Sequence, residues 1–321
     1  MKKAILTFLA SASLIATANA IDYKTVPDWL QLPEGRPSLG DMHGDVAVSS
    51  NGDVYISTKD PKAGVQVYAE NGKFLRVVPD APNDFHGFVI RKQPDGEFIF
   101  GTRLDGQTIM KMTLDGKVKL DIPASAIPDE FKNKNGEGKT SVALTGMDVA
   151  PNGDLYVTDG YASDYVHRFD HEGKYLQSFG GRKAPYNFST LHKIAIDTRF
   201  EPTRIIGCDR KNGRVVHMSL QGEFLGVVAK DLRLPAAVAI YHDYAAIGEL
   251  NGRVTILDKE GKVVAELGEY TGPGVGGNSV KPDKWQTGIV ISPHGVAFNE
   301  HGDLFVSEYN TTGRMHRFDR Q

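Results

Sequence analysis

The sequence has a single cysteine, almost no excess of charge of either sign, and no apolar run long enough to cross a bilayer. Because Cys208 is alone among 321 residues, an intrachain disulfide is excluded. The 37 Lys and Arg residues nearly balance the 40 Asp and Glu residues, so we expect neither a nucleic-acid partner nor an anionic membrane partner. A composition of 40% hydrophobic and 24% charged residues excludes wholesale disorder.

The first 20 residues have the pattern of an export signal. Lys2 and Lys3 precede an apolar run over residues 4–16, which is too short to span a membrane, and Ala18-Asn-Ala20 forms a small-x-small cleavage site. The Met-Lys-Lys start is typical of bacteria. We therefore expect cleavage after Ala20 and a periplasmic or secreted mature chain without a membrane span.

Glycine-centred turns recur along the rest of the chain and precede strands of alternating polarity. Turns of a first type come before the segments VYIST, FIFGT, LYVTD and LFVSE and are centred on Gly52, Gly96, Gly153 and Gly302. Turns of a second type are centred on Gly72, Gly116, Gly173, Gly222 and Gly261, at intervals of 44, 57, 49 and 39 residues. Antiparallel hairpins with this period are typical of propeller blades. We predict an all-β, six-bladed β-propeller that forms a single domain over residues 21–321.

The sixth predicted blade needs a fourth strand from elsewhere, because a second turn after Gly302 would fall one position past Gln321. Residues 24–34 can pair beside Arg314–Phe318 and close the ring, with Pro27 tolerated on an outer edge. The alternative is an open solenoid. Extra residues at about 121–144 and 269–292 are predicted to form loops between blades.

Histidine recurs at one register of the predicted blades. Aligned on the turn glycines, the first strands of the six blades start near Gly44, His86, Thr145, His192, Ala236 and His294. Alternate blades of a sixfold ring are about 120° apart, so His86, His192 and His294 should converge on the axis. Three imidazoles with an open fourth position suit zinc. The alternative is three separate channel histidines bonded to backbone or water. We expect His43, one residue out of register, to point away.

A second set of residues follows the second strands and should lie at the same mouth of the channel. Its members are Lys59, Arg103, Tyr161, Asp209, Arg210, Glu249 and Glu308. A tyrosine and a guanidinium beside a Lewis acid suit proton removal and carboxylate binding. The alternative for each residue is an ordinary solvated loop. His167, His217 and His316 lie in predicted third strands, and we expect them to have no role at the site.

Several motifs resemble the peptidyl-α-hydroxyglycine α-amidating lyases, which are propellers with NHL-type repeats. They are Val157-Thr-Asp-Gly-Tyr161, Leu191-His192, Cys208-Asp-Arg-Lys-Asn-Gly-Arg214 and Pro293-His294-Gly, and the likeness covers about residues 23–319. The resemblance implies a channel zinc held by His86, His192 and His294, a catalytic Tyr161 and a carboxylate-binding Arg210. It implies carbon–nitrogen cleavage of a peptidyl-α-hydroxyglycine into a peptide amide and glyoxylate, hence a small-molecule or peptide substrate. We expect the protein to be a monomer.

The chain departs from that family at two positions of the site. Lys59 stands where the family has a second active-site arginine, and Gly295 replaces an aspartate that ligates calcium in the animal enzymes. Lysine keeps the charge but loses the bidentate fork, and a calcium ion would lack that ligand. A divergent bacterial lyase is therefore the first hypothesis. The others are a non-enzymatic propeller that binds a peptide, glycan or protein, and a lactonase-like hydrolase with channel calcium, against which the three histidines speak.

Overall fold

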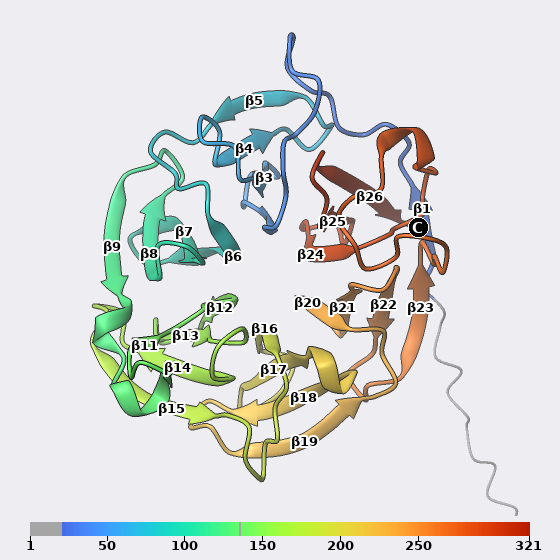
Figure 1. The fold of residues 1–321 in the computed structure, drawn as a ribbon. Coiled ribbons are helices and arrows are strands. Elements are labelled where there is room, and N and C mark those ends of the chain that lie inside the picture. The colour runs from blue at the N-terminus through green and yellow to red at the C-terminus, as the bar shows by residue number, and fades with distance from the viewer. Residues whose placement is uncertain (1–20, 135) are drawn as a thin grey trace, which may run out of the picture.

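The chain forms a ring of six four-stranded antiparallel sheets around a central channel (Figure 1), as the turn spacing predicts. The computed structural model describes residues 21–134 and 136–321. The predicted export signal, residues 1–20, lies outside the described residues. In blades 1–5 the first strand lines the channel and the later strands follow outward in chain order, whereas blade 6 runs outward from β24 through β25 and β26 to the N-terminal strand β1.

The first three blades use strands from residues 46–180. Blade 1 comprises β2 (Val46–Val48), β3 (Val54–Ser57), β4 (Val65–Tyr68) and β5 (Phe74–Val77). Blade 2 comprises β6 (Phe85–Gln93), β7 (Gly96–Arg103), β8 (Thr108–Thr113) and β9 (Val118–Pro123). Blade 3 comprises β12 (Gly146–Val149), β13 (Leu155–Thr158), β14 (Tyr165–Phe169) and β15 (Tyr175–Gly180).

The remaining blades complete the ring. Blade 4 comprises β16 (Leu191–Asp197), β17 (Arg204–Asp209), β18 (Arg214–Ser219) and β19 (Phe224–Ala229). Blade 5 comprises β20 (Pro235–Tyr241), β21 (Tyr244–Glu249), β22 (Arg253–Leu257) and β23 (Val263–Leu267). Blade 6 comprises β24 (Pro293–Phe298), β25 (Leu304–Glu308), β26 (Arg314–Arg320) and β1 (Tyr23–Thr25).

The N-terminal strand closes the ring, but it is shorter than predicted. Tyr23 pairs with Arg320 and Thr25 with Phe318, so both ends of the described chain share blade 6. The strand ends at Thr25, so Pro27 lies beyond it and not within the outer edge strand, where it had been expected. The chain then crosses to blade 1, where Trp29 donates from Nε1 to the Glu70 carbonyl oxygen at 2.7 Å. The same segment therefore joins the last blade to the first.

The hydrophobic core lies mainly between neighbouring blades. One buried cluster, for example, brings Phe98 and Phe100 of blade 2 against Met147, Leu155 and Val157 of blade 3. Six such clusters follow the ring. This packing holds the first strands at fixed angles around the channel, so residues at the same register of different blades converge.

The two predicted loops between blades are only partly irregular. The first begins within β9 and contains the 3₁₀ turns η1 (Ala124–Ala126) and η2 (Asp129–Phe131) and the ribbon β10 (Asn133–Lys134) with β11 (Thr140–Ser141). The second contains the 3₁₀ turn η4 (Pro282–Lys284). None of the helices in the described part of the chain has the length and apolar character needed to cross a membrane.

Candidate metal centre

His86, His192 and His294 each occupy a β-bulge at the start of a first strand. In blades 2, 4 and 6 the pairing with the second strand skips the histidine itself. A bulge leaves one residue out of the ladder and re-aims its side chain. The three rings therefore turn into the channel, where each is at most 3% exposed. Their ring centroids are 4.8–5.0 Å apart in every pair.

The odd blades hold these rings in place through their backbone. The Nδ1 atoms of His86, His192 and His294 lie 2.7, 2.6 and 2.9 Å from the carbonyl oxygens of Thr145, Ala236 and Gly44, respectively. A carbonyl oxygen can only accept a hydrogen bond, so Nδ1 carries the proton in all three rings. Every Nε2 atom therefore keeps a free lone pair. Histidine ligands in metal sites are oriented in the same way, with one ring nitrogen donating to a carbonyl oxygen and the other facing the metal.

The lone pairs outnumber the protons available to them. The Tyr161 hydroxyl lies 3.2 Å from His86 Nε2 and 3.0 Å from His192 Nε2, but its single proton can serve only one of them. The buried His294 Nε2 has no hydrogen-bond partner among the described residues. At least two of the three lone pairs thus lack a donor within the described chain. Buried polar atoms are almost always satisfied, so the cluster fits a bound cation.

The electrostatic surroundings keep these histidines neutral. Burial lowers the pKa of His86, His192 and His294 well below the usual value for an imidazole, and the positive charge of Arg210 lowers the pKa further. Neutral imidazole is the form that binds metals. The cluster is therefore ready to accept a metal ion at neutral pH without first releasing a proton.

The Asp-Gly-Tyr motif places Tyr161 over the histidines. Asp159 accepts hydrogen bonds from the Ala143 N–H at 2.6 Å and the Ser163 hydroxyl at 2.5 Å, which fixes the turn after β13. A Cβ on Gly160 would lie 2.2 Å from the Leu191 carbonyl oxygen, so only glycine lets the turn pass this close to blade 4. Tyr161 then extends over the mouth of the channel.

Arg210 reaches the same point from blade 4. It begins the 3₁₀ turn η3 (Arg210–Asn212), which Asp209 holds by accepting from the Ser189 N–H and the Asn212 amide. Arg210 Nη1 donates to the Tyr161 hydroxyl at 3.3 Å, and its guanidinium lies 5.1 Å from the centre of the tyrosine ring. Burial raises the pKa of Tyr161, whereas the Arg210 charge acts in the opposite direction.

The other residues predicted for this face separate into two groups. Lys59 is exposed at the mouth, and its positive charge adds to burial in lowering the pKa of His43. The charged side chains of Arg103, Glu249 and Glu308 instead form ion pairs with neighbours in the sheets, namely Asp84, Arg253 and Arg314. His217 and His316 also pair with carboxylates, and His167 bonds to Ser178. These residues support the blades rather than the site.

His43 lies in the cluster, so the prediction that it points away was wrong. That prediction assumed strand alternation from residue 43 onward, but β2 begins only at Val46. Residue 42 forms an isolated bridge with Asn310 of blade 6, and His43 follows in irregular backbone. Its ring centroid is 4.7 Å from that of His86 and 5.0 Å from that of His294. The available signal was its position directly before the register shared by the three histidines.

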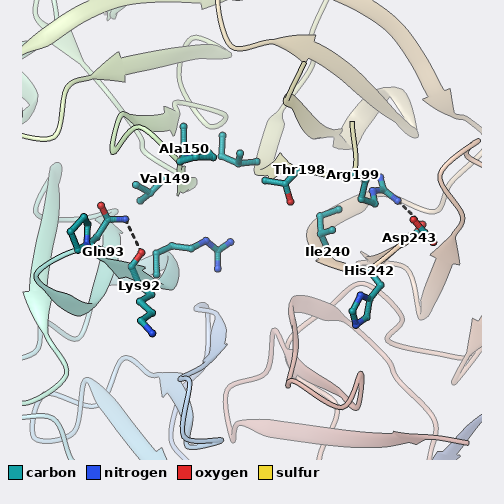
Figure 2. Close-up of a pocket in the computed structure, with 13 residues that line it drawn as sticks. Lys92, Gln93, Val149, Ala150, Thr198, Arg199, Ile240, His242 and Asp243 are labelled. Atoms are coloured by element: carbon teal, nitrogen blue, oxygen red, sulfur yellow. Dashed lines mark hydrogen bonds between the residues drawn. The ribbon is translucent and has the colours of Figure 1, made fainter. Parts of the chain in front are cut away.

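A wide cavity of about 790 Å³ opens at the other end of the channel (Figure 2), where the first strands of blades 2–5 end. Its two arginine side chains are already paired. Arg91 binds Asp148 through two hydrogen bonds of 2.8 and 2.9 Å, and Arg199 binds Asp197 and the Asp243 carbonyl. The lone pairs at the histidine mouth mark it as the stronger candidate for chemistry, although the cavity beside His43 and His86 is only about 10 Å³.

Comparison with solved structures places this fold among β-propellers. A streptogramin B lyase superimposes with a TM-score of 0.59 and 12% identity, covering 94% of this chain and 98% of that chain. A gluconolactonase from Xanthomonas campestris gives 0.60 and 13%, covering 88% and 89%. An inactive virginiamycin B lyase from Staphylococcus aureus with quinupristin gives 0.53 and 15%, covering 93% and 88%. No family model matches the sequence. These likenesses establish the propeller fold.

Proposed function

We propose that this protein is an exported, zinc-dependent carbon–nitrogen lyase similar to the peptidyl-α-hydroxyglycine α-amidating lyases. One observation carries the proposal: three fixed imidazole lone pairs, a tyrosine hydroxyl and a guanidinium meet at one mouth of the channel. The structural neighbours include propellers described as lyases, which agrees with an enzyme on this fold but does not specify the reaction.

His86, His192 and His294 would hold the metal ion through Nε2. A zinc ion bound there would supply a Lewis acid that lowers the pKa of a coordinated hydroxyl group. The surroundings disfavour calcium, because the nearest carboxylate to Gly295, that of Asp45, is buried and ion-paired with Lys193. Three nitrogen ligands also suit zinc better than calcium.

Tyr161 and Arg210 would divide the remaining work. Arg210 holds the substrate carboxylate, and the exposed Lys59 adds positive charge at the same mouth. The Tyr161 oxygen, as phenolate, takes the proton of the substrate hydroxyl. The C–N bond then breaks, the hydroxyl carbon becomes the aldehyde of glyoxylate, and the departing nitrogen receives one proton to become the amide. Burial raises the pKa of Tyr161, and donation from Arg210 together with the charge of a bound metal ion would oppose that shift and favour the ionised form.

Metal content and product release together test this function. Protein purified from the periplasm or medium should begin at Ile21 and contain about one zinc ion per chain. With N-benzoyl-α-hydroxyglycine it should release glyoxylate and benzamide in equal amounts. Zinc-loaded protein that releases no glyoxylate from any α-hydroxyglycine compound refutes the lyase. Bound calcium instead of zinc would favour a lactonase-like hydrolase, and absence of metal would favour a binding propeller.

A further inference from the structure

His43 differs from the other three histidines of the cluster in how it is held. It comes from the irregular segment before β2, whose position is set by two backbone hydrogen bonds between Met42 and Asn310, at 2.9 and 3.1 Å. Its ring packs on that of Tyr309, with centroids 4.5 Å apart. In the described part of the chain its polar ring contact is to the Tyr161 hydroxyl, 3.4 Å from Nε2, so no carbonyl holds this ring as carbonyls hold the others.

The ligand atoms of His43 nevertheless lie close to those of two of the even-blade histidines. One nitrogen from each of His43, His86 and His294 lies within 4.8 Å of the other two. His294 supplies the buried Nε2 that has no partner among the described residues. The Tyr161 hydroxyl touches the Nε2 atoms of His43, His86 and His192. His43 therefore stands on the His86–His294 side of the cluster, and Tyr161 stands on the His86–His192 side.

We infer that His43 is a fourth imidazole ligand of the metal centre, contributed by blade 1. The inference rests on the metal site of the proposed function. The donor set then consists of neutral nitrogens alone, which suits zinc and also iron, copper and nickel. Because its ring lacks a carbonyl anchor, His43 is the ligand expected to contribute least to affinity and to yield first when a substrate oxygen approaches.

Copper(II) substitution counts the nitrogen ligands directly. Full-length mature protein loaded with one equivalent of Cu²⁺ should show electron paramagnetic resonance hyperfine structure from four imidazole nitrogens. His43→Phe, which keeps an aromatic ring against Tyr309, should show three. Its affinity for zinc, measured by competition with a chromophoric chelator, should fall at least ~10-fold. His301→Ala, an exposed histidine outside the site, should match wild type in both measurements.

The outcomes separate this inference from the proposed function. Three nitrogens in wild type, with unchanged zinc affinity in His43→Phe, overturn the fourth ligand and leave the lyase standing. Four nitrogens together with no glyoxylate release uphold His43 as a ligand and refute the lyase. Failure of wild type to bind any metal overturns both. Circular dichroism and thermal unfolding of His43→Phe show whether a lost nitrogen reflects the missing ligand or a damaged fold.

Discussion

At the start of their first strands the even blades carry His86, His192 and His294, whereas the odd blades carry Gly44, Thr145 and Ala236. The two sets share a register but supply different chemistry. The even blades provide lone pairs, and the odd blades provide the carbonyl oxygens that fix the tautomer of each ring. Blade 5 has the same bulge at Ala236 as the even blades have at their histidines. The bulge alone therefore does not create a metal ligand. The ligands arise because the even blades carry histidine at that position and the odd blades do not.

Removing an even-blade histidine should have the largest effect. His192→Ala should lose most of the bound zinc and with it all measurable lyase turnover, because His43, whose ring no carbonyl anchors, cannot make up for a ligand whose ring is fixed. Metal content after dialysis and glyoxylate release measure the two effects. Retention of stoichiometric zinc by His192→Ala would contradict the convergence of the three blades on one ion. His301→Ala is the matched control.

Tyr161 tests the chemistry with the metal site intact. Tyr161→Phe should keep its zinc and lower turnover at least ~100-fold, the scale of a positioned acid–base group. Equal turnover by Tyr161→Phe and wild type would remove the phenol from the mechanism. Loss of zinc from Tyr161→Phe would instead make the phenol a structural part of the cluster.

Arg210→Ala should mainly raise KM for substrates that carry a carboxylate, with a smaller loss in kcat.

Gly44 tests whether the odd-blade carbonyls matter. A Cβ at Gly44 would lie 1.9 Å from Ser57 Oγ and 2.9 Å from the backbone carbonyl oxygen of Ser57, so Gly44→Ala must shift the backbone that holds His294. Zinc affinity should fall ~10-fold, as for other partners of metal-bound histidines. Ala236→Gly keeps its carbonyl without adding an atom and is the control. Equal affinity in both variants would show that the ring orientations do not depend on these carbonyls.

Acid should weaken the metal-free protein through the even-blade imidazoles. The unfolded chain binds protons on histidine below a pKa of about 6.5, but burial holds the folded pKa of His294 well below that value. The unfolded state therefore binds more protons, and stability falls as pH drops below 6.5. Relative to His294→Gln, wild type should lose up to about 1.4 kcal/mol of unfolding free energy per pH unit. Urea unfolding at pH 7.5 and 5.5 measures this difference, and a constant difference would contradict it.

Ring closure and the histidine register could be predicted largely from the sequence. Glycine-centred turns at a steady spacing mark hairpins, and an incomplete last repeat requires a strand from the other end of the chain. The length of that strand was less predictable. Thr25 pairs and Pro27 does not, because the chain must turn toward blade 1 where Trp29 is buried. Such a choice depends on packing between blades that no local pattern records.

The sequence by itself determined which positions carry imidazoles, a tyrosine and a guanidinium, and that alternate blades carry the histidines. Tertiary structure decided which of these groups meet. His43 joined the cluster because residue 42 bridges to Asn310 in the last blade, a contact between residues more than 260 positions apart. The carbonyls that fix the three rings likewise come from the neighbouring odd blades. Sequence periodicity specifies register within a strand, but the direction of a side chain at a bulge or before a strand depends on what packs against the backbone there.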